Sequence, residues 1–337
     1  MKQVLTNSMI GVARWCGLMP TFRRIFAGRA AILMFHEIQS DDRSELMTGT
    51  SVSIFEYSLE WLRREGWEIV TFETCLERLT TESGPRRYAV LTFDDGYRDN
   101  VTTALPILER HDAPFTIYVP TGAPTRTMDS WWLGLREIFR RGDTVTIDAM
   151  GMQFDCPGLH EKTSSLHKVT DWIHQDYHRI AMLAPTFAKA GISMPTLNEA
   201  YFLNERELQN LARHPLVSIG GHTASHAALS CLDTQSARAE MAENRSYLEQ
   251  LLQLPVQHFA YPYGDSRACG PRDADLAREV GFATAVTTRN GQVYDLKSDH
   301  FSLPRVGVGG QFETRAKFEA RMSGIQSAAQ MLLGTRH

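Results

Sequence analysis

The stretch Tyr88-Ala-Val-Leu-Thr-Phe-Asp-Asp-Gly96 indicates the fold class of this chain. Its apolar run predicts a buried strand, and the two carboxylates and the glycine place the end of that strand at a sharp turn. Five similar apolar runs occur elsewhere, at residues 31–35, 115–119, 217–219, 258–261 and 283–286. Helical patterns lie between several of these runs. The alternation predicts an α/β fold with a largely parallel sheet or barrel.

Two of the intervening helices have candidate caps. Ser53 is expected to begin a helix in which Phe55 and Leu59 share one face. Ser236 is expected to begin a longer helix over residues 237–252, which are rich in Ala, Glu and Leu.

The alternation is interrupted at about residues 123–215, a segment that is too long for a loop. We interpret this segment as a helical insertion that begins with a helix at residues 131–140 and ends with a helix at 205–213. The insertion interrupts a main domain at residues 30–308, and a C-terminal helix is expected within 309–337.

Composition limits the function classes. The 337 residues include 35 basic and 39 acidic side chains, and a net charge of −4 argues against nucleic acid as a partner. The length allows one large or two ordinary domains. The five cysteines are scattered and never form a Cys-x-x-Cys pair, so we expect ordinary reduced thiols.

Residues 1–29 form a cationic segment that contains no acidic residue. Leu5, Met9 and Val12 recur there at helical spacing, so the segment either packs on the main domain, which we favour, or lies on an anionic membrane surface. An unbroken apolar stretch suited to a cleaved secretion signal is lacking near the start. We therefore expect a cytoplasmic protein, with contact to the inner face of the membrane as an open alternative.

The acid pair Asp94-Asp95 is the first candidate site. Two adjacent carboxylates at a strand end are electrostatically costly unless a cation or hydrogen-bond donors compensate. Because side chains alternate along a strand, we expect the two acids to point in different directions. Taken alone, the pair is explained equally well by a solvated Asp-Gly turn.

The segment from Gly220 to His226 is the second candidate site, because it follows a predicted strand and carries two histidines four residues apart, His222 and His226. On a helical turn these side chains face the same way. Two neutral imidazoles and one carboxylate make a metal-binding set with an open position. By itself, however, the histidine spacing fits packing or capping better than metal binding.

The turn Pro262-Tyr263-Gly264 is the third candidate site and also follows a predicted strand. Such a turn can leave a backbone N–H free to stabilise an oxyanion. An aromatic structural turn explains the segment equally well.

In this order, the three segments resemble the polysaccharide deacetylases, carbohydrate esterase family four, which is also called the nodulation-type deacetylase homology domain. The resemblance covers about residues 30–308 apart from the insertion. It implies a distorted (β/α) barrel with about seven parallel strands, and hydrolysis of an N-acetyl group on a carbohydrate.

The resemblance also implies a role for each motif residue. Asp94 is the general base, Asp95, His222 and His226 hold a divalent metal, most often zinc, and the Tyr263 amide is the oxyanion donor. This agrees with chemistry in which a metal activates water and polarises the amide while Asp94 accepts the proton. The same ligands also suit iron, cobalt or manganese.

The sequence departs from the family pattern at two positions. Many members have an arginine where this chain has Ala260, and a Leu-x-His segment where it has Leu303-Pro304-Arg305. We expect Arg305 to reach Asp94 and replace the missing arginine, because a guanidinium would keep the base ionised. The alternative for Arg305 is a surface or inter-strand ion pair. His36 is a candidate general acid, although a structural hydrogen-bonding role is equally compatible.

The insertion and the substrate leave further alternatives. Trp131 and Trp132 are expected to border the substrate cleft, with one of the two packed in the core. Because a fold does not fix a substrate, the rival functions are an amidase or imidase, an O-acetyl esterase, and a catalytically silent sugar-binding module. Retention of both acids and both histidines argues against the silent module.

Overall fold

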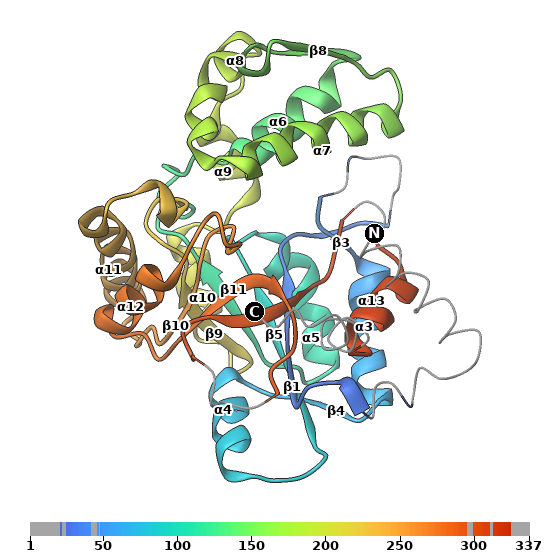
Figure 1. Cartoon of the computed structure of the whole chain (residues 1–337), viewed down its shortest axis with the longest axis vertical. Coiled ribbons are helices and arrows are strands. Elements are labelled where there is room, and N and C mark those ends of the chain that lie inside the picture. Colours follow the sequence, from blue (N-terminus) through green and yellow to red (C-terminus); the bar gives the residue numbers. More distant parts are fainter. Residues whose placement is uncertain are drawn as a thin grey trace.

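The computed structural model describes residues 21, 25–41, 46, 48–294, 299–310 and 313–324. Within them, seven parallel strands close into a barrel, because β1 pairs with β5 on one side and with β12 on the other (Figure 1). The barrel strands are β1 (Ala30–Phe35), β5 (Arg87–Phe93), β6 (Phe115–Val119), β9 (Val217–Gly221), β10 (His258–Ala260), β11 (Thr284–Asn290) and β12 (Leu303–Gly307). The predicted α/β barrel is confirmed. An eighth strand, β4 (Trp67–Ile69), pairs with the first residues of β5 and was not predicted.

Alternation along the strands separates the barrel interior from the layer under the helices. On β5, Tyr88 and Val90 belong to the interior cluster with Ala260 of β10, whereas Ala89 and Leu91 belong to the cluster between strands and helices. Every second side chain of β5 points into the barrel, and this alternation continues through Thr92 to Asp94. Asp94 therefore emerges at the carboxyl end of the barrel.

Helices surround the barrel, and their starts differ from the predicted caps. Helix α3 (Val52–Arg64) is capped by the Ser51 side chain, which accepts from the Ile54 N–H. Ser53 lies inside the first turn and donates to Asp41 instead. Helix α11 (Thr234–Leu252) is capped by Asp233, which accepts from the N–H of Ser236. The predicted caps Ser53 and Ser236 are therefore wrong by two and three residues. The other helices around the barrel are α4 (Phe72–Thr81), α5 (Leu105–Arg110), α10 (Glu205–Leu211), α12 (Pro271–Val280) and α13 (Arg315–Met322).

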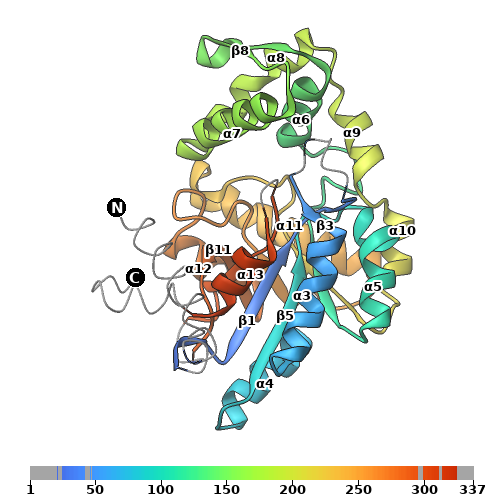
Figure 2. The same ribbon diagram turned by 90° about the vertical axis from the view of Figure 1, so that its right-hand side faces the viewer.

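The segment between β6 and α10 forms a second layer, here called the cap, above the carboxyl ends of the strands (Figure 2). It consists of α6 (Trp131–Arg141), a hairpin of β7 (Thr144–Ile147) and β8 (Met152–Asp155), α7 (Leu159–Gln175), α8 (Ala184–Lys189) and α9 (Met194–Tyr201). Its own core includes Leu135, Phe139, Val169 and Ile173. The predicted insertion therefore contains this cap and also α10, which packs against α11 on the barrel.

The chain segment that enters the cap and the segment that returns from it to the barrel lie side by side. The guanidinium of Arg126 donates to the carbonyl of Ala123, near the start of the cap, and to the carbonyls of Asn198 and Phe202, near its end. Phe202 also forms a β-bridge with Tyr97, directly after the acid pair. The barrel is thus continuous beneath the cap.

Some expectations lie outside the described residues. Most of the cationic segment at 1–29 and the residues after 324 belong to this part, so the structure tests neither the favoured packing of that segment on the main domain nor the alternative contact with a membrane. Among the helices that are described, none has the length and apolarity needed to cross a membrane. The four described cysteines, Cys75, Cys156, Cys231 and Cys269, are free thiols.

Candidate active site

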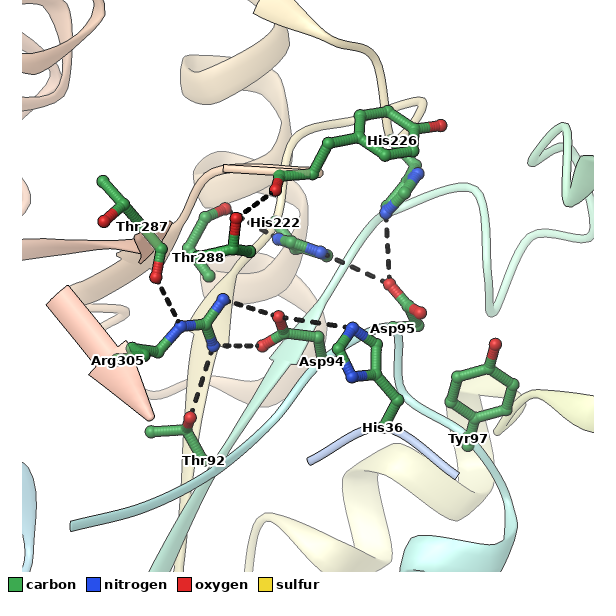
Figure 3. Close-up of polar contacts among 12 residues, drawn as sticks. His36, Thr92, Asp94, Asp95, Tyr97, His222, His226, Thr287, Thr288 and Arg305 are labelled. Atoms are coloured by element: carbon green, nitrogen blue, oxygen red, sulfur yellow. Dashed lines mark hydrogen bonds and ion pairs between the residues drawn. The ribbon is translucent and has the colours of Figure 1, made fainter. Parts of the chain in front are cut away.

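Asp94 and Arg305 form a buried bidentate ion pair inside the mouth of the barrel (Figure 3). The two terminal nitrogens of Arg305 donate to the two carboxylate oxygens, each over 2.7 Å. The same guanidinium donates to Thr92 Oγ1 and to the Thr287 carbonyl, which fixes its plane. Burial acts to raise the pKa of Asp94, but the charge and hydrogen bonds of Arg305, together with smaller contributions from His222 and His36, lower the pKa below its ordinary value. Arg305 thus reaches Asp94 from the last barrel strand, as the sequence suggested.

Asp95, His222 and His226 converge on one point beside this pair. The Nε2 atoms of His222 and His226 lie 3.3 and 3.1 Å from Oδ1 of Asp95, and all three side chains are buried. The backbone of Asp95 has a left-handed φ of 73°, so its side chain leaves the strand in a different direction from that of Asp94. The two adjacent acids therefore serve different partners.

The protonation pattern around Asp95 suits a divalent cation. Nδ1 of His222 lies 2.7 Å from the Ala260 carbonyl, which can only accept, so in the neutral ring Nε2 presents a lone pair toward Asp95. Oδ1 of Asp95 is buried without a hydrogen-bond partner among the described residues. Burial lowers the pKa of His226 and so favours its neutral, ligating form. Lone pairs that face one another without a proton fit a shared metal ion.

The loop that carries the two histidines is not helical, which corrects the predicted helical turn. Thr223 and His226 both have left-handed backbone angles, with φ of 62° and 63°, so the chain turns sharply twice within the segment. Helix α11 holds this loop in place. Its Asn244 accepts from the N–H of His222, and its Glu240 accepts from the N–H and hydroxyl of Ser225. The histidines meet because of this anchoring and not because of helical spacing.

Tyr263 contributes a free backbone N–H, and its ring contacts His226. The turn has left-handed φ angles at Tyr263 and Gly264, and the N–H of Tyr263 donates to no described residue. A Cβ at Gly264 would lie 2.6 Å from the Thr288 nitrogen, so the turn requires glycine there. The hydroxyl of Thr288 donates to the Tyr263 carbonyl and holds the turn against β11.

His36 lies at the edge of the site. Its Nε2 is 3.8 Å from Oδ2 of Asp94, which is longer than a hydrogen bond, and its side chain is 41% exposed. Exposure leaves the ring free to meet a bound molecule, whereas the other predicted site residues are largely buried.

The site opens into a cleft of about 490 Å³ between the barrel and the cap. The barrel side includes His36, Glu37, Asp94, Asp95, His222, His226 and Tyr263, and the cap side includes Trp131, Trp132, Leu166, His167, Thr170 and His174. Trp131 is 2% exposed and belongs to the core of the cap, while Trp132 is half-buried. The cap therefore forms one wall of the cleft.

The sequence shows which family this geometry represents. A profile of the polysaccharide deacetylases matches residues 81–284, which is more than half of the chain. The chain belongs to the polysaccharide deacetylase family. The resemblance inferred from the three motifs is therefore confirmed.

Relatives in this family are distant. YxkH of Bacillus subtilis (strain 168), whose own assignment as a polysaccharide deacetylase is provisional, is 22% identical over 265 residues. That match covers 77% of this chain and 64% of YxkH, so the chain spans slightly less than two thirds of this relative.

Two solved structures share the fold. The Streptococcus pyogenes deacetylase PplD, solved in complex with acetate, gives a TM-score of 0.55 at 19% identity and covers 84% of this chain and 93% of its own. IcaB from Ammonifex degensii gives 0.54 at 18% identity, with 89% and 97% covered.

Several cleft residues were not predicted from the sequence. Glu37 pairs with Arg136 of α6, and this contact between residues 99 positions apart leaves no local signal. Tyr97 follows Asp94-Asp95-Gly96 directly, so its proximity to the motif was a usable signal. Thr170 and His174 show only helical spacing, which is also the spacing of ordinary packing positions.

Proposed function

We propose that this protein removes the N-acetyl group from a carbohydrate, with Asp94 as the base and a divalent metal held by Asp95, His222 and His226. One observation carries the proposal. Two carboxylates adjacent in sequence are directed to different partners at one cleft, Asp94 to Arg305 and Asp95 to the paired imidazoles. A base beside a separate ligand set is what metal-assisted hydrolysis of an amide requires.

The residues of the chain divide the work of hydrolysis. When bound, the metal would polarise the acetyl carbonyl and lower the pKa of the attacking water. Asp94, kept ionised by Arg305, accepts the proton of that water as its oxygen attacks the carbonyl carbon. The N–H of Tyr263 donates to the carbonyl oxygen as negative charge builds there. The C–N bond then breaks, the nitrogen takes up a proton, and acetate and an amine leave.

His36 is the proposed source of the proton for the leaving nitrogen. Its Nε2 lies 3.8 Å from Oδ2 of Asp94, it lines the cleft, and its ring is accessible to a bound molecule.

The walls of the cleft support a sugar as the substrate. Trp132 offers an aromatic surface, and His167 and Thr170 offer polar groups that can bond hydroxyls. A mixture of aromatic faces and hydrogen-bonding groups suits a ring that is apolar on its faces and polar at its edge. Zinc is the proposed metal, since two imidazoles and one carboxylate match its ligand preference.

Acetate release tests the proposal directly. The purified protein is assayed on N-acetylated oligosaccharides, an O-acetylated sugar and a small non-sugar amide, before and after a chelator and after zinc is returned. We expect acetate from the N-acetylated sugars alone, its loss with chelator and its recovery with zinc. Acetate from only the O-acetylated sugar or the small amide would identify a rival hydrolase, and no acetate from any substrate would support the silent module.

A further inference from the structure

The metal ligand His226 lacks the support that His222 has. Nδ1 of His222 bonds the Ala260 carbonyl, whereas Nδ1 of His226 is buried without a hydrogen-bond partner among the described residues. Metal-binding histidines normally donate their second ring nitrogen to an oxygen, and this bond fixes the ring orientation. Something else must therefore orient the ring of His226.

Aromatic rings occupy that role in the structure. The ring centroid of His226 lies 4.8 Å from that of Trp132 and 4.9 Å from that of Tyr263. Trp132 belongs to α6 of the cap, while Tyr263 belongs to a barrel loop. The orientation of a barrel histidine thus depends on a side chain of the cap.

The two tryptophans of α6 are themselves fixed by barrel tyrosines. The indole N–H of Trp132 donates to the hydroxyl of Tyr97 over 2.6 Å, and that of Trp131 donates to the hydroxyl of Tyr263 over 2.9 Å. The two indole planes are perpendicular, so each reaches a different loop. Tyr97 follows the acid pair and Tyr263 lies in the third motif, so α6 is bonded to both loops that frame the metal ligands.

A buried ion pair keeps α6 at this position. Arg136 lies about one turn beyond Trp132 and donates to both carboxylate oxygens of Glu37, next to His36 on the barrel. Arg136 also donates to the hydroxyl of Thr48, so it forms three hydrogen bonds with residues outside the cap. The start of α6 therefore cannot move without breaking buried polar contacts.

We propose that Trp131, Trp132, Tyr97 and Tyr263 form an aromatic clamp by which the cap positions His226 for metal binding. This inference rests on the metal site of the proposed function. It assigns the cap a second task besides forming a wall of the cleft, because metal affinity becomes dependent on the cap. The four residues are positioning residues, and none of them is a metal ligand.

Metal affinity of Trp132 variants tests the clamp without any substrate. Apo wild type, Trp132→Leu, Trp132→Phe and Tyr97→Phe are titrated with Zn²⁺ against a chromophoric chelator, and with Co²⁺ to record its visible absorption bands. Trp172→Leu is the matched control, because Trp172 lies in the same cap, packs on Arg179 and does not line the cleft. Circular dichroism and thermal unfolding of each apo protein report the fold.

We expect Trp132→Leu to weaken Zn²⁺ binding by about 10- to 100-fold, the usual effect of losing a group that orients a metal ligand, and to shift the Co²⁺ bands. Trp132→Phe and Tyr97→Phe should weaken Zn²⁺ binding less. The first keeps an aromatic ring beside His226, and the second keeps Trp132 and removes only its hydrogen-bond acceptor. Trp172→Leu should bind like wild type. Wild-type affinity and bands in Trp132→Leu, or equal weakening in Trp172→Leu, would overturn the clamp alone. Wild type that binds neither ion would overturn the clamp together with the metal site, whichever substrate is cleaved.

Discussion

The mouth of the barrel holds two buried arginine–carboxylate pairs that do different work. Arg305 and Asp94 both belong to the barrel, whereas Arg136 comes from the cap and Glu37 from the barrel. Asp94 faces the cleft and is the base in the proposed mechanism, so its partner would adjust the charge of a reacting group. Glu37 is bonded by Arg136 and Thr48, so its pair is a joint between two layers. An arginine–carboxylate pair thus sets the pKa of a side chain at Asp94, whereas at Glu37 it holds the cap against the barrel.

The largest effect is expected from breaking the joint. Arg136→Ala leaves Glu37 buried without its guanidinium, and breaking a buried pair in this way costs about 3 to 5 kcal/mol. Urea unfolding should show this loss. The double variant Glu37→Gln with Arg136→Met should recover much of it, since no buried charge remains. Equal stability of Arg136→Ala and wild type would show that the joint does not hold the cap.

Removing the reacting charge should lower catalysis more than stability. Asp94→Asn is expected to reduce kcat by about 10²-fold or more, the scale of a general base, while metal content stays near normal. Asp95→Asn should instead lose the metal, and Glu37→Gln should keep kcat within about threefold because it touches no reacting atom. Kinetics and metal analysis of the three variants separate these roles. Equal metal loss in Asp94→Asn and Asp95→Asn would contradict the assignment.

Removing the partner of the base should move the pH profile. Arg305 lowers the pKa of Asp94 against the effect of burial. In Arg305→Ala burial is opposed only by the weaker effects of His222 and His36, so the pKa of Asp94 rises and the base is protonated at higher pH. The acidic limb of kcat/KM should therefore shift to higher pH, with metal retained. A profile that falls in height without shifting would indicate lost positioning, and Arg305→Lys should shift less.

The smallest effect is expected beside the joint. Burial, together with the charge of Glu37, raises the pKa of Asp99 to about 8. The unfolded chain loses this proton near pH 4 and the folded chain keeps it to about pH 8, so stability should fall as pH rises between these values. Asp99→Asn removes the titration. Because Asp99 is only half-buried and solvent screens its charge, the gain at pH 8 relative to pH 5 should be on the order of 1 kcal/mol, less than the full pKa difference would give. Urea unfolding at both pH values measures the difference. If the free energy of unfolding changed equally with pH in the variant and in wild type, the role of Asp99 would be excluded.

The sequence predicted the strands better than it predicted the helix starts. Continuous apolar runs such as 115–119 have few alternatives to a buried strand, and this run matches β6. Two serines that stand close together, Ser51 and Ser53, can both cap a helix, and only the tertiary contact of Ser53 with Asp41 distinguishes them. Strand β4 was missed because it is three residues long and its central Glu68 is exposed.

The site was predictable where each residue follows a strand directly. Asp94 and His222 do so, Tyr263 comes shortly after the end of β10, and parallel strands bring their carboxyl ends together. The left-handed backbone of His226 was not visible, because it depends on anchoring by Glu240 and Asn244 of α11. The joint was equally hidden, since pairing of Glu37 with Arg136 is a consequence of the fold alone.

Arg126 ties the start of the cap to its end, and this has a consequence for how the family can change. Because the two ends of the cap meet, its length does not affect the distance between the barrel elements on either side of it. The barrel can therefore accept segments of different length at this point without a shift in its strand register. The cap can therefore be regarded as a graft, exchangeable in evolution or in the laboratory. The clamp limits that freedom, because any replacement must also supply aromatic support for His226.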